Sequence, residues 1–185
     1  MHGALTVSVL RKRSELSAVA ADCVDLALHC AEPSRLDQPR ARGMRCVLVW
    51  IDRHGSRMLG ALFPFGTPSF YRGLPLLALS SCTPLLRRGW ERACVHALFE
   101  WFRQDGEGAA LLELRALALG GPVYRAFAEV ARRREQLVLS RTAGDGSHTL
   151  LVGDRTWNEL STSALPLLRW AKRGAASVVY GQLQL

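Results

Sequence analysis

Apolar residues recur along this chain at two different spacings, and the spacings predict where strands and helices form. The β-branched residues within 4–10 predict a first strand. Apolar positions then recur every three or four residues from Leu16 to Cys30, which predicts one amphipathic helix with Ser14 as its N-cap. Pro33 ends that pattern, so a polar loop is expected to follow.

Two apolar runs rich in β-branched and aromatic residues come after this loop. The runs 45–52 and 57–65 are joined by a short segment whose Gly55 allows the positive φ of a tight turn, so they predict an antiparallel hairpin. The next apolar run, 74–80, has no polar face and predicts a strand in the centre of the sheet.

Helical and strand-like segments alternate through the next part of the chain. The range 88–104 predicts a helix, and 110–117 predicts a buried strand. Pro122 opens a further helix at a position where proline is well tolerated. The ranges 136–141 and 149–152 predict a second hairpin.

This order of elements predicts an α/β (α+β) fold with a mixed, mostly antiparallel sheet of about six or seven strands flanked by helices. The strands 74–80 and 110–117 are expected to lie side by side. One domain is expected over 1–153, and 154–185 is expected to add a helix, 156–172, and a last strand. The exposed edge of that strand predicts that it either associates with another chain or folds back on the first strand.

The composition is that of a globular protein with a packed core, since 49% of the residues are hydrophobic and 22% are charged. Arginine carries almost all of the formal net charge of +8, and its planar guanidinium suits carboxylate or phosphate partners. The densest basic run, Arg132 to Arg134, ends a predicted helix, where cations complement the helix dipole without a ligand. No basic stripe interleaved with aromatic residues accompanies the charge, so nucleic acid is not expected as a partner.

The cysteines and histidines do not predict chemistry of their own. Five cysteines, without any C-x-x-C pair, fall in apolar stretches and are expected to be reduced core residues of a cytoplasmic protein. No histidine has ligand spacing with another histidine or with a cysteine, so no metal site is expected. The longest uncharged stretch, 73–86, is shorter than the roughly 20 apolar residues that cross a bilayer, so no membrane span is expected.

The segment from Arg87 to Ala93 leads from the predicted central strand into a helix, and it resembles the phosphate loop of the GNAT acyltransferases, R/Q-x-x-G-x-G/A. The order hairpin, central strand, helix, strand, helix is also similar to that family's fold. The resemblance implies acetyl-CoA or another acyl-CoA as cofactor, with its pyrophosphate on backbone N–H groups at the helix N-terminus. The residues that the resemblance assigns to cofactor binding are Arg87, Arg88, Gly89 and Trp90.

Two positions of this loop depart from the family pattern. Leu86 stands where the family has Arg or Gln, and Glu91 stands where the family has a second small residue. A carboxylate at the helix start repels a pyrophosphate, so binding of acyl-CoA in the family's manner is expected to be weak or absent.

Tyr124 lies on the helix after the next strand, where the resemblance implies a tyrosine that acts as general acid toward the departing thiolate. Phe127 is the other residue that fits this position of the family. Tyr124 also has helical spacing with Phe127 and Val130, which is typical of a core tyrosine with a hydrogen-bonded hydroxyl. The sequence leaves the catalytic and the core interpretation of Tyr124 open.

More specifically, the chain resembles the N-terminal half of the CelD-like acyltransferases, bacterial proteins associated with cellulose and exopolysaccharide synthesis that carry two GNAT-like halves in tandem. The end of the chain, 154–185, resembles the incomplete start of the second half. The segments that carry this resemblance are the early helix and residues 47–52, 60–65, 84–86, 157–160 and 168–173.

Two functions follow from this resemblance. The first is an N-acyltransferase half that moves an acyl group from acyl-CoA to an amine of an envelope or polysaccharide-related acceptor. The second is a non-catalytic GNAT-like domain that packs against an acyltransferase half. The partners expected are a second GNAT half or, in a homodimer, a second copy. Glu91, in place of a small residue, favours the second function.

Overall fold

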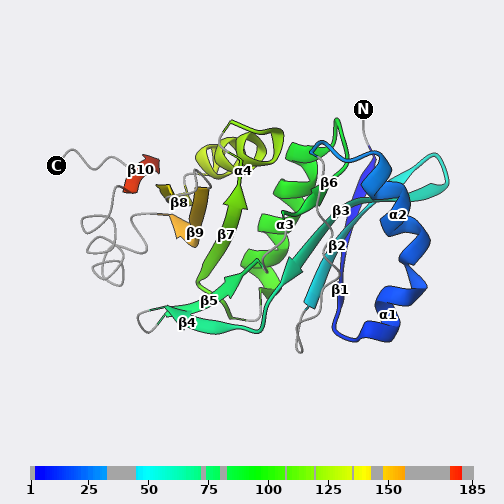
Figure 1. The fold of residues 1–185 in the computed structure, drawn as a ribbon, viewed down its shortest axis with the longest axis horizontal. Helices are drawn as coiled ribbons and strands as arrows, with labels where there is room; N and C mark the ends of the chain where they lie inside the picture. The colour runs from blue at the N-terminus through cyan, green and yellow to red at the C-terminus, as the bar shows by residue number, and fades with distance from the viewer. Residues whose placement is uncertain are drawn as a thin grey trace.

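The computed structural model describes residues 3–32, 45–71, 74–79, 83–106, 108–118, 120–134, 136–142, 148–156 and 176–180. In these ranges the elements are β1 (Ala4–Leu10), α1 (Arg13–Ala18), α2 (Ala20–Leu28), β2 (Arg45–Arg53), β3 (Ser56–Phe65), β4 (Ser69–Tyr71), β5 (Leu74–Ala78), β6 (Leu85–Leu86), α3 (Glu91–Asp105), β7 (Leu111–Leu117), α4 (Pro122–Arg133), β8 (Gln136–Thr142), β9 (His148–Thr156) and β10 (Ala176–Tyr180). They form three layers, with α1 and α2 on one side of the strands β1 to β3 and with α3 and α4 on the other (Figure 1).

Two sets of hydrogen-bonded strands meet at one edge of β3. Their orders are β1-β2-β3-β6 and β10-β8-β9-β7-β5-β4. β6 pairs with β3 at Ala61 and Leu62, and a bridge from Phe65 to Leu79 joins the end of β5 to the same strand. Among the described strands every named pairing is antiparallel except that of β5 with β7. The predicted mixed, mostly antiparallel α/β (α+β) fold is therefore confirmed, as is the adjacency of β5 and β7.

The described residues contain ten strands, more than the six or seven predicted. β4 has three residues and β6 has two, and segments that short leave no periodic signal in a sequence. β9 continues to Thr156, so the residue predicted to begin a last helix ends a strand, and the rest of that predicted helix lies outside the described residues. β10 pairs with β8, so the last strand joins the sheet there and not on β1.

The single helix predicted for the early chain is two helices. Val19 separates α1 from α2, and its φ of −111° and ψ of 17° interrupt the helical backbone. Ser14 lies inside α1 and is not its N-cap. The carboxylate of Glu15 instead accepts the backbone N–H groups of Arg11 and Lys12 at 2.7 and 3.0 Å, which satisfies two donors at the start of the helix.

β2 is buried on both faces, which explains its unbroken apolar run. Alternate side chains of a strand point to opposite faces, and here they enter two cores. Cys46, Leu48 and Trp50 pack against α2, whereas Val47 and Val49 enter the core that α3 and α4 cover. The same strand therefore holds helices against both sides of the sheet.

Aromatic rings fasten α3 and α4 to β3. Phe127 of α4 meets Phe63 of β3 edge to face, with ring centroids 6.1 Å apart, and lies 5.8 Å from Phe99 of α3. Phe65 stacks on Trp101 at 6.3 Å. Edge-to-face and offset contacts of this kind are the arrangements that aromatic pairs prefer. They fix the position of both helices whose N-termini form the candidate site.

Candidate functional site

The predicted phosphate loop lies between β6 and α3, and a bulge in β3 helps to place it. The register of β2 with β3 shifts by one residue at Gly60, where an added Cβ would lie 2.7 Å from a neighbouring side chain. The carbonyl of Gly60 accepts the N–H of Arg87 at 2.8 Å, and the carbonyl of Arg87 accepts the N–H of Trp90 at 3.0 Å. Gly89, at φ +82°, completes the turn before α3 begins at Glu91.

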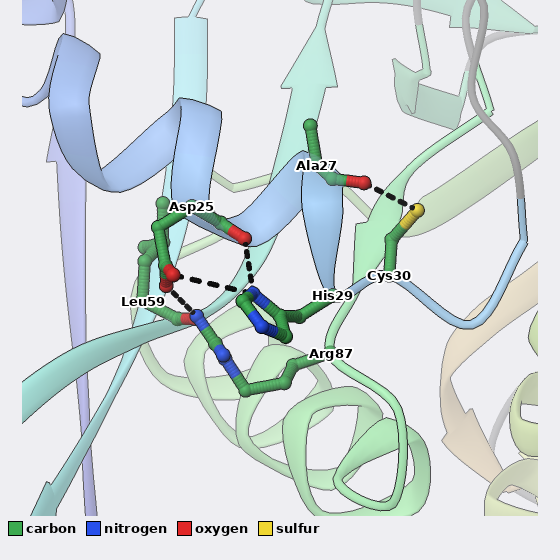
Figure 2. Close-up of polar contacts among 6 residues, drawn as sticks. All are labelled: Asp25, Ala27, His29, Cys30, Leu59 and Arg87. Carbon is green, nitrogen blue, oxygen red and sulfur yellow. Dashed lines mark hydrogen bonds and ion pairs between the residues drawn. The ribbon is translucent and has the colours of Figure 1, made fainter.

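Figure 2 shows that the side chain of Arg87 is directed toward α2 and β3. Its guanidinium pairs with Asp25 through Nη2 and donates from Nε to the carbonyl of Leu59 at 2.9 Å, and only 12% of the side chain is exposed. The hydrogen bond from Arg87 lowers the pKa of the Asp25 carboxyl below its ordinary value. His29 also contacts Asp25, with Nδ1 2.9 Å from the carbonyl oxygen and 3.2 Å from Oδ1. Arg87, which the family resemblance assigns to cofactor binding, therefore joins α2 to the loop.

Glu91 contacts the loop from the side of α3. Its Oε1 accepts the N–H of Gly89 at 3.0 Å, so a donor that the resemblance assigns to a phosphate already has a carboxylate partner. Arg88 is exposed, and its N–H donates to the carbonyl of His29 at 3.0 Å. Trp90 is half-buried and packs against the main core. Of the four residues assigned to the cofactor, only Arg88 and Gly89 are exposed.

The segment that follows α2 runs alongside the loop and reaches α4. Ala31 donates its N–H to the carbonyl of Leu86 at 2.8 Å. Glu32 then lies at the start of α4, where its Oε1 accepts the N–H of Val123 at 3.0 Å. The N-terminal regions of α3 and α4 therefore each have a carboxylate of this chain as hydrogen-bond acceptor, Glu91 and Glu32.

Gly121 leaves the space through which Glu32 reaches α4, because an added Cβ there would lie 2.2 Å from Glu32 Oε1. We expect Glu32→Ala and Gly121→Ala each to lower the free energy of unfolding by about 1 kcal/mol, the usual contribution of an N-cap. Both changes remove one contact, so the double variant should lose little more than either single variant. Urea denaturation measures these differences. Glu32→Gln keeps an acceptor oxygen and is the control, and fully additive losses would contradict the cap.

A surface groove of about 650 Å³ lies between the start of α3 and the length of α4. Tyr124 lines it and is half-buried against the core, whereas Phe127 is fully buried and is not exposed to the groove. Glu129 also lines it and lies 2.7 Å from Arg92 Nε and 2.7 Å from Arg133 Nη2. The other lining residues are Glu91, Pro122, Arg125, Ala126, Ala128 and Arg132. The structure thus brings Tyr124 and the first residues of α3 to one surface.

The thiols of the described cysteines are free, and two of them are core residues as predicted. Burial raises the pKa of Cys46 to about 11 and that of Cys94 to about 12, so neither forms a thiolate at neutral pH. Cys23 and Cys30 are half-buried, and Cys82 lies outside the described residues.

The part of the chain that the structure describes contains neither a metal-binding cluster nor a membrane-spanning helix. No three His, Cys, Asp or Glu side chains gather there in a group that could hold a metal ion. No helix within those ranges combines the length and the apolar character that crossing a bilayer requires.

Three residues that shape the site, Asp25, Glu32 and Gly60, were not predicted from the sequence to be site residues. Asp25 and Glu32 act on positions 62 and 91 residues away, and nothing in the local pattern points to those partners. Gly60 does carry a signal, because an isolated glycine inside a strand pattern is typical of a bulge.

No family model and no curated protein matches this chain. Among solved structures it is similar to a domain from Methanocaldococcus jannaschii DSM 2661, with a TM-score of 0.49 and 8% sequence identity. The similarity covers 82% of this chain and 99% of that chain. At this identity the likeness says nothing about function.

Proposed function

We propose that this chain is a non-catalytic GNAT-like domain that packs against an acyltransferase half and leaves acyl transfer to it. The observation that carries the proposal is the hydrogen bond from the N–H of Gly89 to Glu91 Oε1 at 3.0 Å. In the family that the sequence resembles, N–H groups of this loop hold a pyrophosphate. A carboxylate in that place uses one of the donors and repels the charge of the phosphates.

The cations of the loop support the same proposal. Arg87 would be the natural partner of a phosphate, but its guanidinium is held by Asp25 and by the carbonyl of Leu59. Leu86, where the family has a basic or amide side chain, is 1% exposed and belongs to the core. Of the two other arginines in 87–93, Arg92 pairs with Glu129 and Arg88 is exposed. Exposed arginines are weak counterions for a pyrophosphate.

The element order supports the GNAT part of the proposal. The hairpin β2–β3 leads to β5, then to α3, to the parallel strand β7 and to α4, which is the order that the resemblance implies. The loop at Gly89 lies at the start of α3, as the resemblance requires of a phosphate loop. Under this proposal the chain has the fold of the family but does not bind the family's cofactor.

The N-acyltransferase itself is the second candidate, with acyl-CoA as donor and an amine of an envelope or polysaccharide-related acceptor. The groove of about 650 Å³ favours it, because Tyr124 and the first turn of α3 line the same surface. Tyr124 would act there as the general acid toward the thiolate of CoA. If this candidate is right, Tyr124→Phe should lower kcat at least tenfold in an assay of CoA release, with binding of acyl-CoA unchanged.

Titration with acyl-CoA separates the two candidates. We expect the melting temperature of the wild type to stay constant with acetyl-CoA and longer acyl-CoAs. Glu91→Gly removes the carboxylate and restores the family's small residue, so it should allow binding. A ligand at about ten times its Kd adds about 1.4 kcal/mol of stability, roughly 3 to 5 °C for a chain of this size.

Two control variants isolate the role of Glu91. Glu91→Gln keeps an acceptor for the N–H of Gly89 and removes only the charge, so it should bind less than Glu91→Gly. Asp105→Asn removes the same charge at the other end of α3 and should behave as the wild type. Micromolar binding of acetyl-CoA by the wild type in calorimetry would overturn the proposal that Glu91 keeps a pyrophosphate out of this loop.

A further inference from the structure

β1 offers an edge to which another strand can be added. It stands at the end of the order β1-β2-β3-β6, so its outer edge pairs with no strand in the described ranges. Its seven residues present backbone N–H and C=O groups over about 24 Å. The strand holds neither proline nor charge, the features with which proteins usually protect such edges.

A groove of about 500 Å³ lies between β1 and α3. Leu5 and Val7 of β1 line it together with Ala97 and Trp101 of α3. The other lining residues are polar side chains of α3, His96, Glu100, Gln104 and Asp105. Leu5 and Val7 pack against the main core but remain half-exposed. An added strand beside β1 would cover these side chains and extend the core beneath α3.

Trp101 lines this groove, and its indole N–H is buried. Its side chain is buried, with 9% of the residue exposed, and its Nε1 has no hydrogen-bond partner. Buried N–H groups without an acceptor are rare in folded proteins because desolvation leaves them unsatisfied. The Nε1 atom is itself covered by the protein, so it does not identify what binds in the groove.

We propose that the occupant is a second copy of this chain, whose β1 pairs antiparallel with the first β1 around a two-fold axis at Val7. In that register Leu5 lies opposite Val9 and Thr6 lies opposite Ser8. The strand is thus a near-palindrome of apolar and hydroxyl residues, which is what a two-fold interface requires, since each patch must complement itself. Leu5, Val7 and Val9 lie on the side of α3, and the hydroxyl pair lies on the other face together with Ala4 opposite Leu10.

Charge at the two ends of β1 favours the antiparallel arrangement. Arg11 and Lys12 follow the end of the strand, whereas Asp52 is the register partner of Ala4 at its start, with Arg57 Nε 3.9 Å away. Two-fold pairing keeps Arg11 and Lys12 of the two copies at opposite ends of the paired strands. Parallel pairing would place Arg11 beside Arg11 and is disfavoured by repulsion. The inference goes beyond the proposed function and does not depend on it.

Cysteine crosslinking of the full chain tests the interface and its register. Val7 is opposite itself, so Val7→Cys should form a 7–7 disulfide under mild oxidation. Thr6→Cys is the matched control, because two copies of residue 6 would be about 8 Å apart between Cα atoms, beyond the reach of a disulfide. Leu5→Cys and Val9→Cys should crosslink only when mixed. Peptide mass spectrometry identifies the 7–7 product against the native cysteines.

The expected result is a 7–7 disulfide that forms at least tenfold faster than any 6–6 product. Sedimentation should show a reversible dimer between about 10 and 300 µM, since a contact of this size is at the low end of specific interfaces. A strictly monomeric protein over that range overturns the proposal. A dimer in which Val7→Cys crosslinks no faster than Thr6→Cys also overturns it, because the two copies then meet through a surface other than β1.

Discussion

Phe127→Ala is expected to lower the free energy of unfolding by about 3 to 5 kcal/mol, the range for deleting a fully buried phenyl ring. Phe127 is 0% exposed and contacts Phe63 of β3 and Phe99 of α3. Its removal leaves a cavity where α4, α3 and the sheet meet, and the surrounding rings can fill it only in part. Urea denaturation followed by circular dichroism measures the loss.

Phe70→Ala is the control for this prediction. Phe70 is 76% exposed, so its removal should change the free energy of unfolding by less than about 0.5 kcal/mol. A loss below about 1 kcal/mol for Phe127→Ala would mean that the three rings do not form the junction described above.

Arg87→Ala is expected to lower the free energy of unfolding by about 2 to 3 kcal/mol, because it leaves the carbonyl of Leu59 without its donor and removes the buried stem of the side chain. The neighbouring Arg88 is exposed, and Arg88→Ala should stay within about 0.5 kcal/mol of the wild type. Thermal and urea unfolding of both variants provide the comparison. Equal stability of the two variants would show that Arg87 does not join α2 to the loop.

The pH dependence of stability tests the same contact from the side of Asp25. Its pKa is lowered by the hydrogen bond from Arg87, so ionised Asp25 stabilises the fold above its ordinary pKa of 3.8. That contribution is lost as pH falls through the lowered pKa of the folded state. The difference in stability between the wild type and Asp25→Asn should therefore be constant near neutral pH and shrink below about pH 4. A difference that grows on acidification would contradict the contact.

The sequence predicted helices and strands correctly wherever the spacing of apolar residues stayed constant over several residues. The hairpin β2–β3, the helix α3 and the helix α4 were predicted because their apolar residues repeat with a clear period. The two-residue strand β6 was not, since it is defined only by its pairing with β3. The division of the early helix at Val19 was also missed, because both halves keep their apolar residues on one face of the sheet.

The candidate site was less accessible to prediction than the fold. A motif gave the position of Gly89 at the start of α3, but it did not show where the side chain of Arg87 points. That direction depends on Asp25 and on the bulge at Gly60, which tertiary packing brings to the loop. The carboxylate of Glu91 was readable as a departure from the family pattern, whereas its bond to Gly89 was not.

The cap on α4 depends on Glu32, a residue that lies far from this helix in the sequence. Glu32 and Val123 are 91 residues apart, and the entropy of closing such a loop must be overcome before their bond can form. Contacts of this sequence separation slow folding and form after local ones. A chain leaving the ribosome from its N-terminus therefore exposes Glu32 long before α4 exists, and α4 gains this cap only when the distant segment docks against it.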